Sequence, residues 1–205
     1  MKLVIFGDEL LSNRDSAGEL LAKRLGMEFD NLAEPDTSNS RIHKKIVKYL
    51  IENNTADTII LIGWTSPYRM DAEYNSHYFT YRNDKNDYPS SIVNKLHNYD
   101  NYIFDRVVIN QRWASIVYGV QELLNAHQCR YFMFNTQQHI EFMSYTEKII
   151  RNLNSKFYFD AINTKNTMKE YLVNLGYKNI FTNSACDEYA RFLAQKFRQN
   201  GLVGK

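Results

Sequence analysis

The run Thr58-Ile59-Ile60-Leu61-Ile62-Gly63 decides the fold class of this sequence. Apolar and β-branched residues in an unbroken row, ended by glycine, are typical of a strand that is buried on both faces, as in a parallel sheet. Leu3–Phe6, ended by Gly7, has the same form. Residues 27–32, which are followed by Pro35, predict a further strand that lies between these two in the sequence.

Helical periodicity fills the intervals between the strands. Apolar residues recur at helical spacing over residues 20–25 and stop at Gly26. Ser38 or Ser40 can cap a second helix that runs to about Ile51. Three rounds of strand, turn and helix within about the first 65 residues indicate parallel strands with right-handed crossovers. We therefore expect an α/β fold, namely a three-layer αβα, flavodoxin-like parallel sheet.

The remaining elements resume after an interruption at residues 66–100. This stretch is rich in Tyr, Asn and Asp, and we expect a long insertion without regular structure. No internal repeat or linker is found, so one domain is expected over residues 1–205. The later elements are expected as helices at about 100–127, 138–152, 165–175 and 186–199, and as strands at 131–134 and 156–159.

Composition excludes several classes of function. Lys and Arg number 25 against 23 Asp and Glu, so the net charge of +2 does not favour binding to nucleic acid. No apolar run has the length of a signal peptide or membrane span, so we expect a cytoplasmic protein. Cys129 and Cys186 lack metal-binding or redox spacing and are expected to be free thiols. We expect no metal and no cofactor.

Short polar residues follow several of the predicted strands. In a parallel α/β sheet, ligands bind where the carboxyl ends of the strands converge. The segments at these ends are Gly7-Asp8-Glu9, residues 31–39, residues 63–66, residues 135–136 and the loop before the last helix. Apart from the carboxylates at Asp8 and Glu9, the candidate binding residues are Asp36, Asn39, Gly63, Trp64, Thr65, Ser66 and Asn135.

Three of these segments resemble those of SGNH (GDSL-type) hydrolases. They are Gly7-Asp8 after the first strand, the pattern Asn-Leu-Ala-x-Pro-x-x-Ser-Asn at residues 31–39, and Ile62-Gly63-Trp64-Thr65-Ser66-Pro67-Tyr68-Arg69. The resemblance is nearest in character to the small SGNH-like proteins of bacteriophages, and it covers about the first 70 residues. It implies a flavodoxin-like αβα domain and a family in which many members hydrolyse esters, including acetyl groups on sugars.

The catalytic residues of that family do not carry over to this sequence. Glu9 stands where the resemblance implies the nucleophilic Ser, and Asp36 stands where it implies a glycine oxyanion donor. The family's Asn falls at Thr65 or Ser66. Its Asp and His lie before the last helix, yet no histidine follows His139. Acyl transfer by that route needs a hydroxyl and a base within hydrogen-bond reach, so Ser-His chemistry is not expected.

Carboxylates offer a different chemistry at the same edge. Asp8, Glu9 and Asp187 form the candidate catalytic set of a degenerate site, with Asp36 nearby. If these side chains converge, they would hold a hard cation or act as an acid/base pair. The structural alternative is that they cap helices, and for Asp187 and Glu188, at the start of the last helix, capping is favoured.

The insertion at residues 66–100 is unusually rich in tyrosine. Loops rich in tyrosine present rigid aromatic rings as contact area, each with a polar hydroxyl at its tip, and this suits recognition of proteins or carbohydrates. The alternative is that the rings only pack over the edge of the sheet. The candidate interaction residues are Tyr68, Tyr74, Tyr78, Tyr81 and Tyr88.

Two functions remain from these observations. The first is a non-catalytic binding or structural protein, as in a bacteriophage virion, whose partners are phage structural proteins, other proteins or further copies of itself, with carbohydrate as an alternative ligand. For a phage protein the location would be the host cytoplasm or the virion. The second is an active ester or carbohydrate-ester hydrolase with a rearranged carboxylate-based site. A nucleotide- or metal-binding regulator built on the same strand ends is less favoured, because Gly7 stands outside any phosphate-binding glycine motif.

Overall fold

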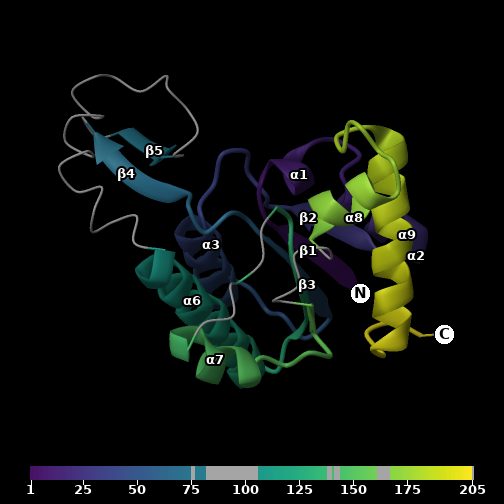
Figure 1. Cartoon of the computed structure of the whole chain (residues 1–205). Helices are drawn as coiled ribbons and strands as arrows, with labels where there is room; N and C mark the ends of the chain where they lie inside the picture. The colour runs from purple at the N-terminus through teal and green to yellow at the C-terminus, as the bar shows by residue number, and fades with distance from the viewer. Residues whose placement is uncertain (75–76, 82–105, 138–139, 141–143, 161–166, 205) are drawn as a thin grey trace.

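The computed structural model describes residues 1–74, 77–81, 106–137, 140, 144–160 and 167–204 (Figure 1). Its main sheet has five parallel strands in the order β2-β1-β3-β6-β7. This is the flavodoxin-like order, and it confirms the predicted fold class. The strands are β1 (Lys2–Phe6), β2 (Glu28–Asn31), β3 (Thr58–Trp64), β6 (Arg130–Asn135) and β7 (Tyr158–Phe159).

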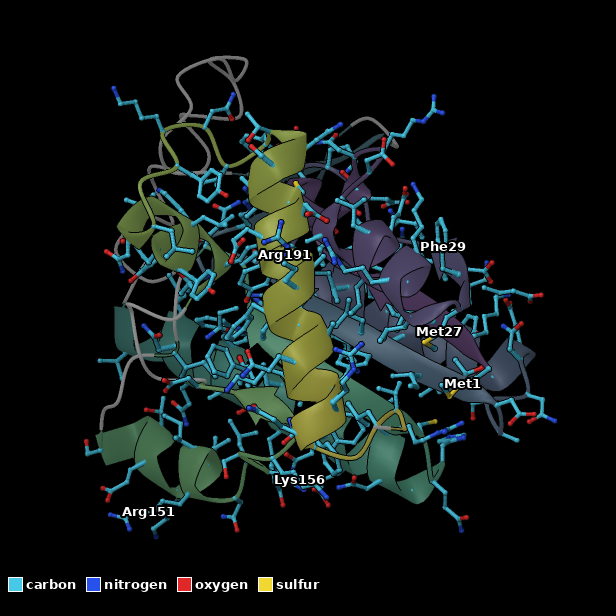
Figure 2. The ribbon with its side chains drawn as sticks, turned by 90° about the vertical axis from the view of Figure 1, so that its right-hand side faces the viewer. Met1, Met27, Phe29, Arg151, Lys156 and Arg191 are labelled. Atoms are coloured by element: carbon cyan, nitrogen blue, oxygen red, sulfur yellow. The ribbon has the colours of Figure 1, made fainter. Side chains whose placement is uncertain are left out.

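Helices cover both faces of this sheet (Figure 1). Figure 2 looks onto one face and shows α9 crossing in front of the sheet, with Arg191 on it. That face is covered by α1 (Glu9–Ser12), α2 (Ala17–Leu25), α8 (Met168–Asn174) and α9 (Asn183–Gln199). The other is covered by α3 (Asn39–Glu52), α6 (Arg106–Ala126) and α7 (Ser144–Arg151).

The central strands explain why this sequence forms a two-sided core. Successive side chains of a strand point to opposite faces. In β1, Leu3 and Ile5 join the core under α2 and α9, whereas Val4 and Phe6 join the core under α3 and α6. All four side chains are buried. Continuous apolar runs are therefore needed here, which is why these strands could be recognised from sequence.

Local capping sets the helix boundaries. Ser38 caps α3 by accepting a hydrogen bond from the Arg41 amide at 3.1 Å, which decides between the two serines predicted for this role. Gly26 ends α2 in the left-handed conformation, with φ of 63°, as its position in the sequence predicts. The last helix begins at Asn183 and is capped by Thr182. The expectation that Asp187 opens this helix is therefore wrong.

The insertion after β3 contains regular structure that was not predicted. β4 (Met70–Tyr74) and β5 (His77–Tyr81) pair in an antiparallel hairpin, which forms a sheet of its own (Figure 1). The expectation of an irregular segment is wrong for these residues. The rest of the insertion up to residue 105, with Tyr88, lies outside the described residues.

Two further sequence expectations can be compared with the structure. Cys129 and Cys186 are free thiols, as predicted. Within the described part of the chain, no helix has the length and apolar character needed to cross a membrane.

Glycines at the ends of β1 and β3 form a notch for α1. A Cβ atom on Gly63 would lie 2.6 Å from Leu11 Cδ1 and 2.7 Å from Thr136 Cγ2. A Cβ atom on Gly7 would lie 2.7 Å from the same Leu11 methyl group. Leu11 is fully buried against the two strand ends. The two glycines thus allow α1 to sit on the edge of the sheet directly above the candidate site.

We expect Gly63→Ala to lower the free energy of unfolding by about 2 kcal/mol, because the added methyl group overpacks this notch. The measurement is urea denaturation followed by circular dichroism. Gly119→Ala is the matched control, since a Cβ atom there meets nothing within 4 Å. In the interior of α6 the control should raise stability by about 0.5–1 kcal/mol. Equal denaturation midpoints for Gly63→Ala and wild type would contradict the notch.

Candidate functional site

Asp8 lies at the carboxyl end of β1 and begins α1. Its Oδ1 accepts a hydrogen bond from the Leu10 amide at 3.1 Å, so Asp8 is the N-cap of this helix. The structural alternative considered for the carboxylates, helix capping, is therefore correct for Asp8. The residue is fully buried, with 0% of its surface exposed. A capping carboxylate is common, but complete burial of one requires further partners.

The second carboxylate oxygen of Asp8 has those partners. Its Oδ2 lies 2.7 Å from Thr136 Oγ1 and 3.2 Å from Gln137 Nε2. Arg69 Nη1 lies 3.8 Å away. Burial, followed by the charge of Glu9, raises the pKa of Asp8 to about 6, while Thr136 and Arg69 act in the opposite direction. Asp8 thus takes up a proton far more readily than an exposed aspartate.

Glu9 is held by a two-pronged ion pair with Arg69. Arg69 Nη1 donates to Glu9 Oε2 at 2.5 Å, and Nη2 donates to Oε1. Gln137 Nε2 also donates to Oε1, at 2.7 Å. The Arg69 side chain is only 5% exposed and that of Glu9 19%. Bidentate, charge-assisted pairs of this kind are strong and geometrically specific. Asp8, Glu9, Arg69, Thr136 and Gln137 are called the carboxylate–arginine cluster below.

The Thr136 hydroxyl links the cluster to the backbone of β3. Its Oγ1 lies 2.7 Å from Asp8 Oδ2 and 2.9 Å from the Trp64 carbonyl oxygen. A hydroxyl has one hydrogen and cannot donate to both acceptors. If Asp8 is protonated, its own hydroxyl donates to Thr136, and Thr136 then donates to Trp64. If Asp8 is ionised, the Thr136 hydroxyl can donate to it instead, and this hydrogen bond is one of the contacts that oppose the rise of its pKa.

The other predicted binding residues at the strand ends mostly hold the scaffold together. The Asn39 amide pairs with both backbone groups of Thr65, accepting at 2.9 Å and donating at 3.1 Å. Asn135 Oδ1 accepts from the Tyr158 hydroxyl at 2.5 Å. Ser66 Oγ accepts from the Tyr68 amide, and Trp64 is fully buried. The structure thus brings these residues to the same edge of the sheet, but chiefly into internal contacts.

Asp187 is not assembled with Asp8 and Glu9. It lies on α9 and forms ion pairs with Arg24 of α2 and with Arg191, and the Arg24 hydrogen bond chiefly lowers its pKa. Asp36 lies exposed in the turn after β2, with a left-handed backbone at φ of 53°. The predicted convergence is therefore found for Asp8 and Glu9, which share Arg69 and Gln137, and not for Asp187. No group of three His, Cys, Asp or Glu side chains in the described residues is placed to hold a metal ion.

Arg69 and Gln137 were missed as site residues. The strand-end segments up to Ser66 carry several carboxylates and no cation, and Arg69 is the first cation that follows them. That imbalance is a signal that buried carboxylates would need Arg69 as a partner. For Gln137 we find no comparable signal, since it only follows a predicted strand end.

The tyrosines predicted to form an interaction loop fall in three places. Tyr68 lies in the loop after β3 and is half-buried. Tyr74, Tyr78 and Tyr81 lie in the hairpin, where the register pairs Tyr74 with His77. Tyr88 lies outside the described residues. Their role in recognition stays a prediction.

Comparison with solved structures finds a distant likeness. The chain is similar to protein YxiM of Bacillus subtilis, with a TM-score of 0.55 and 12% sequence identity. The match covers 100% of this chain and 58% of that protein, so the chain spans little more than half its length. At this identity the likeness shows the fold alone, an α/β fold with helices on both faces of a parallel sheet. No protein-family model and no curated protein sequence matches the chain.

Proposed function

We propose that this SGNH-like chain acts as a non-catalytic binding or structural protein. The observation that carries the proposal is the ion pair of Glu9 with Arg69. Glu9 occupies the position at which the family resemblance implies the nucleophile, and both of its oxygens accept hydrogen bonds from a buried guanidinium. This arrangement stabilises the end of β1 and leaves no hydroxyl nucleophile there.

The second carboxylate does not restore a catalytic site. A general base must come within hydrogen-bond reach of the proton that it removes. Asp8 has no exposed surface, and its oxygens are directed to Leu10, Thr136 and Gln137. No part of a substrate can reach this carboxyl group in the folded structure.

The alternative is an ester or carbohydrate-ester hydrolase with a carboxylate-based site. One observation favours it, because the raised pKa of Asp8, at about 6, is typical of acid/base residues. The cause of that shift is chiefly burial, which also removes Asp8 from contact with substrate. The non-catalytic function therefore accounts for more of the geometry.

We expect the purified chain to hydrolyse p-nitrophenyl acetate and acetylated xylan no faster than buffer alone. Glu9→Gln is the matched variant, since it keeps the shape and the contact with Gln137 while removing the negative charge. A fluorophosphonate probe should leave every serine unlabelled. Turnover in the wild type that vanishes in a folded Glu9→Gln variant would contradict the proposal and favour the hydrolase.

A narrower proposal concerns the partner. The resemblance to phage proteins and the tyrosine-rich insertion support a place among the structural proteins of a bacteriophage particle. This predicts that the chain copurifies with intact particles from infected cells, as measured by mass spectrometry. Its absence from the particles would remove the phage assignment and leave the non-catalytic function untouched.

A further inference from the structure

A chemically labile pair of residues stands at the end of α9. The sequence contains one asparagine that is followed directly by glycine, Asn200-Gly201. An Asn-Gly pair is prone to lose ammonia spontaneously, because glycine has no Cβ atom to hinder the approach of its amide nitrogen to the asparagine side chain. Asn200 is half-buried and Gly201 is exposed, so water reaches the pair. The end of α9 therefore contains a candidate site of covalent change.

Two main-chain hydrogen bonds close the turn that contains this pair. The Gly201 amide donates to the Arg198 carbonyl oxygen at 3.2 Å, and the Leu202 amide donates to the Phe197 carbonyl oxygen at 2.9 Å. Gly201 has a left-handed backbone with φ of 70°. These bonds and this conformation form a Schellman motif, which ends many helices. Helix termination thus explains why glycine stands at position 201, and the lability of the pair comes with it.

Leu202 holds this turn closed from the side of the core. Its side chain is 4% exposed and belongs to the core cluster under α9, together with Phe197. Phe197 packs in turn against Phe132 of β6, with ring centroids 5.5 Å apart. The turn can open only when Leu202 leaves the core. Opening is therefore a local unfolding event whose frequency depends on the burial of this leucine.

The closed turn prevents the loss of ammonia. Asn200 has ψ of 0°, and this angle turns the Gly201 nitrogen away from the Asn200 side chain that it would attack. The hydrogen of that nitrogen, which must be lost in the reaction, is engaged with the Arg198 carbonyl oxygen. Both obstacles disappear when the turn opens. The rate of the reaction should therefore follow the fraction of molecules in which the turn is open.

We propose that Asn200 is a site of spontaneous deamidation and that the turn closed by Leu202 sets its rate. In the open turn the Gly201 nitrogen attacks Cγ of Asn200. The hydrogen of that nitrogen and the side-chain NH2 group leave together as ammonia, and a succinimide ring remains. Water then opens the ring at either carbonyl group and gives aspartate or isoaspartate at position 200. Nothing is oxidised or reduced, and water is the co-reactant.

Either product weakens the turn that protected the site. Isoaspartate adds a carbon atom to the main chain between α9 and Leu202, so the two hydrogen bonds of the turn cannot both keep their register. Aspartate places a negative charge at the C-terminal end of the helix, where the helix dipole disfavours it, although Lys196 and Arg198 in the last turn reduce this effect. A chain that has reacted once therefore stays loosened at this end of α9. The proposal does not rest on the proposed function.

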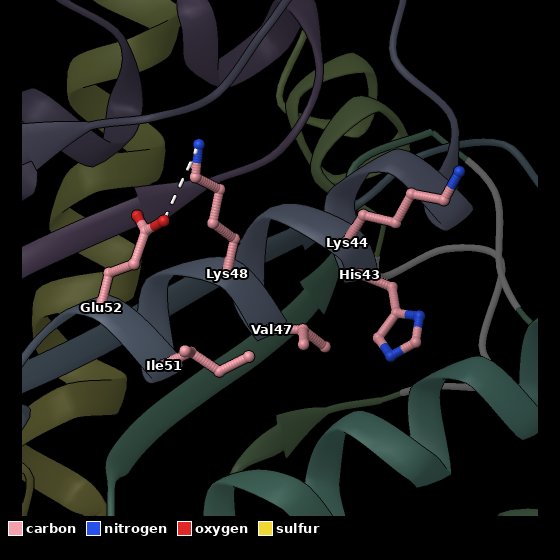
Figure 3. Close-up of a pocket in the computed structure, with 6 residues that line it drawn as sticks. All are labelled: His43, Lys44, Val47, Lys48, Ile51 and Glu52. Atoms are coloured by element: carbon pink, nitrogen blue, oxygen red, sulfur yellow. Dashed lines mark ion pairs between the residues drawn. The ribbon is translucent and has the colours of Figure 1, made fainter.

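The test incubates the full folded chain in mildly alkaline buffer and follows the tryptic peptide of residues 199–205 by mass spectrometry. Conversion in the folded chain should be at least about tenfold slower than in a synthetic peptide of these residues, because the turn is mostly closed. Leu202→Ala should raise the rate at least about fivefold, since it removes the buried anchor. Ile51→Ala is the matched control, because Ile51 is 77% exposed on the outer side of α3 (Figure 3), and it should leave the rate unchanged.

Two further measurements keep the test decisive if Leu202→Ala does not fold. Asn200→Gln should remove the signal, which assigns it to Asn200 rather than to Gln199 in the same peptide. In the wild type, hydrogen exchange of the Leu202 amide reports the open fraction of the turn, and this fraction multiplied by the rate in the peptide should give the rate in the folded chain. No conversion at position 200 on the timescale that this product gives would overturn the proposal. So would a rate equal to that of the free peptide, or one that a folded Leu202→Ala variant leaves unchanged.

Discussion

Replacing Arg69 with methionine should lower the free energy of unfolding at pH 7 by about 3–5 kcal/mol, the typical cost of removing one partner from a buried ion pair. Methionine keeps much of the volume of the arginine stem but removes the guanidinium. Glu9 would then be a largely buried carboxylate without its arginine partner, although Gln137 would still donate a hydrogen bond to it. Asp8 would lose its nearby cation as well.

Urea denaturation of Arg69→Met against wild type measures this effect. Arg191→Met is the matched control, because Arg191 also pairs with two carboxylates but is 60% exposed. Its effect should stay below about 1 kcal/mol. Adding Glu9→Gln to Arg69→Met should recover part of the loss, since it removes the unpaired charge. Similar losses for Arg69→Met and Arg191→Met would show that burial does not strengthen the cluster.

The second large effect concerns pH and Asp8. Its pKa is raised from 3.8 to about 6 in the folded chain, so the folded state binds this proton more tightly than the unfolded state. The resulting stability is fully present below pH 3.8 and is lost as the pH rises through about 6. At 1.36 kcal/mol per pKa unit, the loss between pH 4 and pH 7.5 is about 2.5 kcal/mol, since pH 4 lies slightly above the pKa of the unfolded state.

Other carboxylates have an opposite effect on the pH dependence of stability. The stability of the wild type must therefore be compared with that of Asp8→Asn, which lacks only the titration of Asp8. Asp15 and Asp187 have lowered pKa values, and their ion pairs lose stability as the pH falls. Asparagine keeps the helix cap and cannot ionise. The difference in unfolding free energy, wild type minus Asp8→Asn, should therefore rise by about 2.5 kcal/mol from pH 7.5 to pH 4. A difference that stays constant over this range would show that Asp8 is ionised throughout.

The fold could be predicted because its strongest signals are local. The runs Leu3–Phe6 and Ile59–Ile62 are apolar at every position, which only strands buried on two faces require. The hairpin at residues 70–81 was missed although its second strand, His77–Tyr81, is rich in β-forming residues. Its first strand, Met70–Tyr74, contains Asp71, Ala72 and Glu73, which are uncommon in strands and gave this segment the composition of a loop.

The candidate site was predicted only in part, because its contacts join distant parts of the chain. The rule that sites lie at the carboxyl ends of parallel strands correctly predicted that Asp8 and Glu9 lie at one edge of the sheet. The partners of Glu9 are 60 and 128 residues away, at Arg69 and Gln137. Contacts between residues so far apart leave no periodic pattern in the sequence. The sequence also does not show where the chain comes back to the edge of the sheet after the long insertion that follows β3. Asp187 was included on its position before a helix, but that helix begins earlier, at Asn183.

The ion pair between Glu9 and Arg69 also limits how this site can change during evolution. A single change of Glu9 to serine would leave the Arg69 guanidinium buried beside Asp8 without its main partner. A single change of Arg69 to an uncharged residue would likewise leave the Glu9 carboxylate without its main partner. Each first step therefore lowers stability before any catalytic gain can arise, since marginal stability tolerates few such losses. Related chains should change positions 9 and 69 together, and a serine at position 9 requires both changes.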